Sequence, residues 1–191
     1  TFDERRRWLL ATADLMSNER AKTVGLMAHH VAKTMHEGDP EVSEAIDFCR
    51  YYATAARQLQ GRVSVLDGAT GERNELSHVP RGVWCCISPW NFPLAIFTGQ
   101  IVAALVTGNT VVAKPAETTP EVALAMTDLL YRAGVPRDAL HVLPMVGKEF
   151  GDIARLSLMS FLRRVLEKTS MNDANYECHF FLIVLGIIRF T

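Results

Sequence analysis

An asparagine between two prolines is the densest chemical feature of this sequence. It lies in the segment Ile87-Ser88-Pro89-Trp90-Asn91-Phe92-Pro93, where the two prolines fix φ and so hold the Trp90 and Asn91 side chains rigidly. An asparagine amide is a neutral donor that can stabilise negative charge developing on a substrate oxygen. A turn asparagine that bonds to its own backbone is the structural alternative. The spacing alone is compatible with both interpretations.

A cation and an anion three residues apart form the second feature. Lys114 and Glu117 lie in the segment Val111-Val112-Ala113-Lys114-Pro115-Ala116-Glu117-Thr118-Thr119-Pro120. In a dinucleotide-binding fold the ribose hydroxyls arrive at the end of the second strand, where a lysine donor and a glutamate acceptor can bind them. A solvated surface ion pair is the alternative, and the spacing leaves both open.

The elements that must position these residues alternate between strand and helix. Short apolar runs predict strands over residues 83–87, 110–113 and 140–143, and helical patterns predict helices over 93–106 and 120–133. This βαβαβ order, with short crossovers, predicts an α/β fold with a partial Rossmann-like parallel sheet. Such sheets bind ligands beyond the carboxyl ends of their strands, here residues 88–92, 114–118 and 144–151.

The residues before this unit predict helices. Helical spacing from Phe2 to about Val31 indicates two helices that meet at Ser17-Asn18-Glu19, and a third is expected to begin at Asp39-Pro40-Glu41. There the acids would oppose the helix dipole. The expected buried stripe of the third helix is Val42, Ala45, Ile46, Cys49, Ala53 and Ala56, and residues 62–80 are expected to form a loop or short hairpin.

Together these segments resemble the aldehyde dehydrogenase superfamily over roughly residues 1 to 155. The order and spacing match from Pro80 to Gly151, including Ala104-Leu105-Val106-Thr107-Gly108-Asn109-Thr110, Ala133-Gly134-Val135-Pro136 and Leu143-Pro144. The stretches Glu41–Ala53 and Asn91–Gln100 resemble one branch in particular. That branch is the L-glutamate-γ-semialdehyde (1-pyrroline-5-carboxylate) dehydrogenases, both stand-alone and within bifunctional proline-utilisation proteins.

The resemblance implies a role for each matching position. Asn91 matches the oxyanion-hole asparagine, which stabilises the thiohemiacetal formed when the catalytic cysteine attacks the aldehyde. The positions expected to bind the cofactor NAD are Ile87, Ser88, Pro89 and Trp90, which line it, Lys114 and Glu117 at the adenosine ribose, and Gly147 and Gly151 beside the adenine. Met145 stands where the family often has another glycine. The parent reaction would be NAD-dependent oxidation of L-glutamate γ-semialdehyde to L-glutamate.

Three segments that the family uses do not occur in the 191 residues: Phe-Thr-Gly-Ser, Glu-Leu-Gly-Gly and Gly-Gln-x-Cys, which carries the nucleophile. Cys178 has a neighbouring histidine but nothing else in common with the nucleophile segment. We therefore expect a fragment that is inactive alone. The alternatives are a non-catalytic nucleotide-binding or interaction fragment and one part of a split enzyme. The expected divisions are a helical segment at 1–80, a partial NAD-binding domain at 81–156 and a divergent tail at 157–191.

Composition limits the partners. A formal charge of −1 provides no broad basic field for nucleic acid or anionic membranes, so a small aldehyde in the parent enzyme fits better. Four cysteines without zinc or disulfide spacing, and scattered histidines, predict no metal site and a reducing, cytoplasmic compartment. Family members form homo-oligomers, which the sequence leaves open here. The start at Thr1 suggests a cut through a longer protein.

The tail after Leu156 loses the family character. Residues 157–168 could form a helix, and the apolar run from His179 to Phe190 is prone to form a strand. Twelve residues are too few to span a bilayer as a helix, so a buried strand or a non-native tail is favoured over a membrane anchor.

Overall fold

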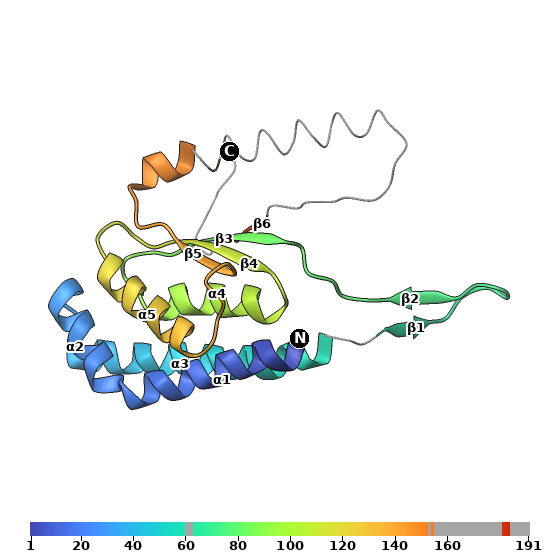
Figure 1. Ribbon diagram of the computed structural model, residues 1–191, viewed down its shortest axis with the longest axis horizontal. Coiled ribbons are helices and arrows are strands. Elements are labelled where there is room, and N and C mark those ends of the chain that lie inside the picture. The colour runs from blue at the N-terminus through green and yellow to red at the C-terminus, as the bar shows by residue number, and fades with distance from the viewer. Residues whose placement is uncertain (60–62, 153, 155–180, 184–191) are drawn as a thin grey trace.

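The computed structural model describes residues 1–59, 63–152, 154 and 181–183 of the chain (Figure 1). Three helices come first: α1 (Phe2–Asn18), α2 (Arg20–Val31) and α3 (Met35–Leu59). The two expected N-terminal helices are confirmed, and their junction lies at Glu19 as predicted. Helix α1 begins with a capping box, in which Thr1 and Glu4 satisfy each other's free backbone N–H groups.

The predicted start of α3 at Asp39 is wrong, because the helix begins four residues earlier. Thr34 precedes the first turn, and the Glu37 carboxylate accepts hydrogen bonds from the Thr34 backbone N–H and hydroxyl at 3.0 and 2.9 Å. Pro40 consequently lies inside α3, where it forgoes one helical hydrogen bond. Asp39 does not cap its own helix but accepts a 2.8 Å hydrogen bond from Arg20 on α2.

The predicted apolar stripe of α3 is confirmed. All six of its residues are buried: Val42, Ala45, Ile46, Cys49, Ala53 and Ala56. They belong to one core cluster that includes Leu9 and Met16 of α1. Helices α1, α2 and α4 therefore all pack against α3.

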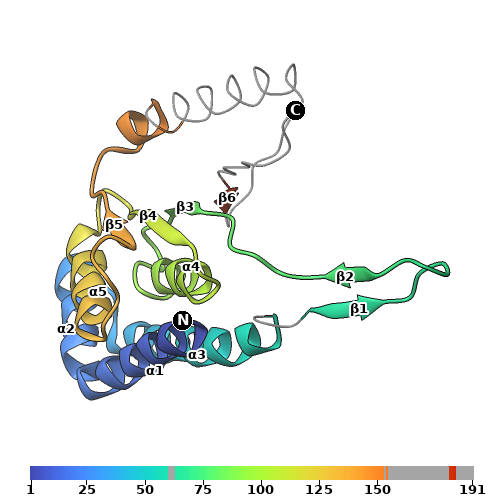
Figure 2. The same ribbon diagram turned by 45° about the vertical axis from the view of Figure 1, so that its right-hand side comes forward.

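Residues 63–80 form the predicted hairpin. Strands β1 (Ser64–Leu66) and β2 (Asn74–Leu76) pair antiparallel and project away from the body of the molecule (Figures 1 and 2). Gly71 in the connecting turn has a φ of +93°, which glycine adopts without steric cost. Val65 and Leu66 are exposed, so the hairpin contributes little to the core.

The remaining strands form the predicted parallel sheet. They are β3 (Val83–Ile87), β4 (Thr110–Lys114), β5 (Leu140–Val142) and β6 (Phe181–Ile183), in the order β5-β4-β3-β6. Helices α4 (Ala95–Val106) and α5 (Pro120–Arg132) connect the first three strands and lie on the same face of the sheet, with α1 to α3 beyond them (Figure 2). The βαβαβ unit is thus confirmed, with boundaries that differ from the prediction by at most two residues.

Helix α4 lies in the middle of this arrangement. Nearly all its residues are buried, since it packs against the sheet on one side and against α3 on the other. Gly99 permits the close approach: a β-carbon added there would lie 2.9 Å from the Phe48 ring. A helix that is apolar all round is typical of such a buried position.

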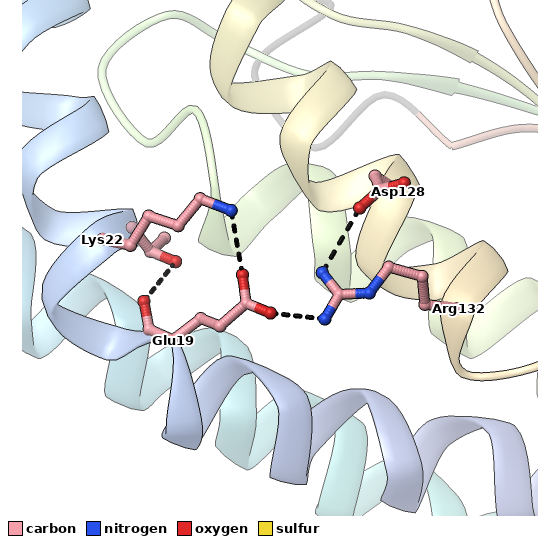
Figure 3. A network of polar contacts seen from close by, with 5 residues as sticks. Glu19, Lys22, Asp128 and Arg132 are labelled. Carbon is pink, nitrogen blue, oxygen red and sulfur yellow. Dashed lines mark hydrogen bonds and ion pairs between the residues drawn. The ribbon is translucent and has the colours of Figure 1, made fainter.

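A surface network joins α5 to the junction of α1 and α2. The Glu19 carboxylate accepts from Lys22 and from Arg132, and Arg132 also binds Asp128 at 3.3 Å (Figure 3). Hydrogen bonds from these two cations lower the pKa of Glu19 to about 2. The network thus links α5 to the N-terminal helices, against which α5 also packs.

Within the described ranges, the tail contributes one strand. Residues 181–183 pair parallel with Trp84–Cys86 of β3, so this part of the predicted apolar run is a strand. The predicted helix at 157–168 and Cys178 lie outside the described residues. No described helix is both long enough and apolar enough to cross a membrane.

Candidate functional site

The two candidate segments meet at one edge of the sheet. Strands β3 and β4 pair in parallel with Ile87 opposite Lys114, so the residues that follow each strand emerge side by side. The Ser88 backbone N–H donates to the Lys114 carbonyl at 3.1 Å, which joins the segments directly. Gln100 of α4, the helix that packs against the sheet, donates to the Ile87 carbonyl at 3.1 Å and so holds the end of β3. This is the edge at which open α/β sheets bind ligands.

The turn after β3 presents Trp90 and Asn91 to solvent. Ser88 is buried and Pro89 is half-buried, whereas Trp90 is 65% exposed and Asn91 is also exposed. Trp90 lines two cavities of about 440 and 490 Å³, and Asn91 and Phe92 line the larger one. Among the described residues the Asn91 amide makes no hydrogen bond, so it is not tied to its own turn and can donate to a ligand.

The end of β4 brings three of the predicted residues together. The Glu117 carboxylate accepts a 3.1 Å hydrogen bond from the Gly147 backbone N–H. A β-carbon added at Gly147 would lie 3.8 Å from the Lys114 Nζ. Gly151 is exposed and has open space around it, and no contact links it to the other predicted residues in the described part of the chain.

Ser88 and Lys114 each carry a polar side-chain group that has no partner among the described residues. The Ser88 hydroxyl is buried without a hydrogen bond among the described residues. Lys114 is only 6% exposed, and in the same part of the chain its ammonium has neither an ion pair nor a hydrogen bond. Because buried polar groups are nearly always satisfied, the Ser88 hydroxyl indicates a missing partner, whereas the Lys114 ammonium, which is not among the fully buried unpartnered atoms, is free to donate to a ligand. Hydroxyl groups of a nucleotide fit this donor set, with Glu117 as the acceptor and the glycine at 147 leaving space.

The described cysteines do not form a nucleophile. Cys49, Cys85 and Cys86 are buried free thiols, as their predicted core positions require. Desolvation raises the pKa values of these thiols to about 12, 11 and 12, respectively. They are therefore fully protonated near neutrality, and a protonated thiol is a poor nucleophile. The described residues also contain no cluster of three His, Cys, Asp or Glu side chains that could hold a metal ion.

One residue at this site was assigned the wrong task from the sequence. Glu41 was expected to sit in the first turn of its own helix and oppose its dipole, but its carboxylate is buried and reaches across to the start of α4. The signal was present, because Glu41 lies four residues before Ala45 and eight before Cys49, on the buried stripe of α3. A charged residue in a buried stripe needs a specific partner.

Comparison with known proteins gives a consistent family. Residues 1–156 match the aldehyde dehydrogenase family. The chain is 42% identical over 144 residues to a 1-pyrroline-5-carboxylate dehydrogenase of Geobacillus sp. (strain WCH70). The aligned residues make up 75% of this chain and 28% of that protein. It is 43% identical over 148 residues to the bifunctional protein PutA of Escherichia coli (strain K12), covering 78% of this chain and 10% of PutA.

Solved structures agree with this result. A 1-pyrroline-5-carboxylate dehydrogenase from Thermus with bound NAD superposes with a TM-score of 0.75 at 39% identity, over 80% of this chain and 30% of that one. A bifunctional proline utilization A protein superposes with a TM-score of 0.74 at 44% identity, over 78% of this chain and 15% of the other. The chain therefore spans less than a third of the proteins that it resembles.

Proposed function

Because this chain belongs to the aldehyde dehydrogenase family, we propose that it supplies the adenosine-side half of an NAD site and the oxyanion-hole amide of a 1-pyrroline-5-carboxylate dehydrogenase. The observation that carries the proposal is the shared edge at which the turn after β3 and the end of β4 meet. When bound, NAD accepts a hydride from the substrate. The substrate in such an enzyme would be L-glutamate γ-semialdehyde.

Each residue has a defined task in this proposal. Lys114 would donate to the adenosine ribose, and Glu117 would accept from it in place of the Gly147 N–H. Ile87, Ser88, Pro89 and Trp90 would line the path of the cofactor. Gly147 and Gly151 would leave space beside the adenine, and Asn91 would donate to the substrate oxygen. A preorganised neutral donor of this kind stabilises charge as it forms, with no reorganisation at the moment of reaction.

The 191-residue chain is proposed to be inactive in aldehyde oxidation. It contains none of the family's nucleophile and glutamate segments, and its described thiols are protonated. Without a nucleophile no covalent intermediate can form. We therefore expect no NADH from this chain with L-glutamate γ-semialdehyde and NAD, whereas turnover by the purified chain would contradict this assignment.

NAD binding tests the proposal directly. The chain contains three tryptophans, so 5-fluorotryptophan labelling should give three ¹⁹F resonances, with Trp90→Phe assigning one of them. NAD should move the Trp90 resonance at about millimolar concentration, since half of a site forgoes many contacts. The resonance of Trp8, which lies against Gly134 rather than at this edge, should not move. No response at about 10 mM NAD, well above the dissociation constant expected of so weak a site, would remove the proposal.

The lysine gives a matched control. Lys114→Met keeps the length of the buried side chain but removes the donor, so NAD should bind at least about tenfold more weakly. Lys148→Met changes an exposed lysine nearby and should leave binding unchanged. NADP should bind more weakly than NAD, because Glu117 would repel a 2′-phosphate. Equal loss in both lysine variants would show that general charge, rather than this site, attracts the nucleotide.

A further inference from the structure

The buried carboxylate of Glu41 connects three elements. Glu41 lies on α3 and is 2% exposed. One of its oxygens accepts hydrogen bonds from the backbone N–H groups of Leu94 and Ala95, at 2.8 and 3.1 Å. The other oxygen is bonded to the ammonium of Lys33, which lies between α2 and α3. Both carboxylate oxygens are thus used.

The first pair of bonds caps α4. Leu94 precedes the helix and has no side chain that could satisfy the free N–H groups of the first turn. A carboxylate at a helix N-terminus accepts from these groups and also interacts favourably with the positive end of the helix dipole. Helix α4 therefore takes its cap from α3, 53 residues earlier in the chain.

The lysine extends this contact to the turn that carries Asn91. The Lys33 side chain is 15% exposed, and its Nζ lies 4.5 Å from the centre of the Phe92 ring. The ammonium thus interacts with the carboxylate and with an aromatic face, both favourable arrangements for a desolvated cation. Phe92 follows Asn91, and both line the cavity of about 490 Å³ together with Lys33.

We propose that Glu41 and Lys33 form a positioning pair that fixes the turn between β3 and α4, and with it the direction of the Asn91 amide. Glu41 holds the end of the turn at Leu94 and Ala95, and Lys33 holds its middle at Phe92. The catalytic meaning of this pair rests on the proposed function, which gives Asn91 its role. The positioning itself is a property of the chain without ligand.

Amide hydrogen exchange tests the positioning without any cofactor. In Glu41→Ala the amides of Leu94 and Ala95 should exchange at least about tenfold faster than in the parent chain, because they lose the one acceptor that they have in the described part of the chain. The amide of Thr98, which donates to the Leu94 carbonyl at 2.9 Å, should change much less. The matched control Asp47→Ala removes an exposed acid from the same helix and should leave all three amides unchanged.

The conservative variant separates positioning from general stability. Glu41→Gln keeps an acceptor oxygen for Leu94 and Ala95, so their protection should be largely retained. It removes the charge that holds Lys33, so the ¹⁹F resonance of 5-fluorotryptophan at Trp90 should shift or broaden. If Glu41→Ala fails to fold, this variant alone decides. Unchanged exchange in Glu41→Ala, or an unchanged Trp90 resonance in Glu41→Gln, would overturn the proposal.

Measuring NAD binding to the parent chain and to the variants distinguishes this inference from the proposed function. If the parent chain does not respond to NAD, the proposed function fails, while the exchange and ¹⁹F results still decide whether Glu41 and Lys33 position the turn. If the parent chain binds NAD, Glu41→Gln should weaken binding through the turn, and Asp47→Ala should not. Equal NAD affinity in the parent chain and in Glu41→Gln, despite a displaced Trp90 signal, would overturn the link between the pair and the site.

Discussion

The ends of β3 and β4 lie side by side but are held in different ways. The turn after β3 is fixed by the buried Glu41 carboxylate, which has three donors from Lys33 and the start of α4. At the end of β4, the Lys114 side chain is largely buried, but its ammonium is not among the fully buried unpartnered atoms and has no partner among the described residues. One edge of the sheet thus contains a satisfied charge and an unsatisfied one.

This difference indicates separate tasks. A group whose partners are all within the protein fixes geometry in advance, as an amide in an oxyanion hole requires. A buried group without a partner gains one when a ligand binds, which contributes to affinity. In the proposed site, the β3 side would therefore orient the ligand and the β4 side would capture it.

Two lysine variants test this contrast with the largest expected effect. Lys33→Met leaves the Glu41 carboxylate buried without its cation, and such a change typically costs about 3 kcal/mol of unfolding free energy. Lys114→Met removes a charge that has no partner among the described residues, so the unfolding free energy should stay the same or rise by up to about 1 kcal/mol. Urea unfolding followed by circular dichroism measures both. Equal losses in the two variants would contradict the contrast.

The packing of α4 on α3 gives the next effect. Gly99→Ala would place a β-carbon 2.9 Å from the Phe48 ring, which itself stacks on Tyr52. The Phe48 ring or the two helices must shift, at a cost of about 1–3 kcal/mol in unfolding free energy.

The control is Gly25→Ala in α2, where a β-carbon meets nothing within 4 Å. Alanine has the higher helix propensity, so this variant should be more stable by about 0.5–1 kcal/mol. In Gly99→Ala we also expect faster exchange of the Leu94 amide, because α4 moves relative to Glu41. Normal protection of that amide would show that the Glu41 carboxylate moves with α4 and keeps its hydrogen bond to Leu94.

The smallest expected effect is the loss of fold stability at low pH when Glu19 is protonated. The pKa of Glu19 is lowered from 4.5 to about 2 by its hydrogen bonds to Arg132 and Lys22, so the network stabilises the fold above pH 4.5. This contribution is lost as the pH falls from 4.5 towards 2, since the unfolded chain binds the proton more tightly. Glu19→Gln should flatten the dependence of the thermal midpoint on pH in that range. An unchanged slope would contradict the role of the network.

The βαβαβ unit could be predicted from local signals. Short apolar runs and helical patterns gave boundaries within two residues of those observed. The start of α3 was missed because Asp39-Pro40 is also a good helix-start signal. The helix instead begins after Thr34, whose backbone N–H and hydroxyl both donate to the Glu37 carboxylate. The pairing of residues 181–183 with β3 could not be predicted, since it joins segments far apart in sequence.

The parts of the site that depend on neighbouring residues in the sequence were predictable, and the contacts between distant segments were not. Lys114 ends its strand, and Asn91 and Glu117 come shortly after strand ends, so their shared edge followed from the parallel sheet. The contact between Gly147 and Glu117 spans 30 residues and was not predicted, although the resemblance assigned both residues to the adenosine side of one site. The cap that Glu41 gives to α4 depends on how two helices cross, which no sequence pattern specifies.

The most direct test of the nucleotide site uses backbone amide resonances. In a ¹H–¹⁵N titration with NAD, the amide of Gly147 should shift because the ribose displaces it from Glu117, and the amides of Trp90 and Asn91 should shift with the same dissociation constant. Common saturation of these three signals would show that both strand ends bind one molecule. Shifts at only one strand end, or different dissociation constants, would contradict the account.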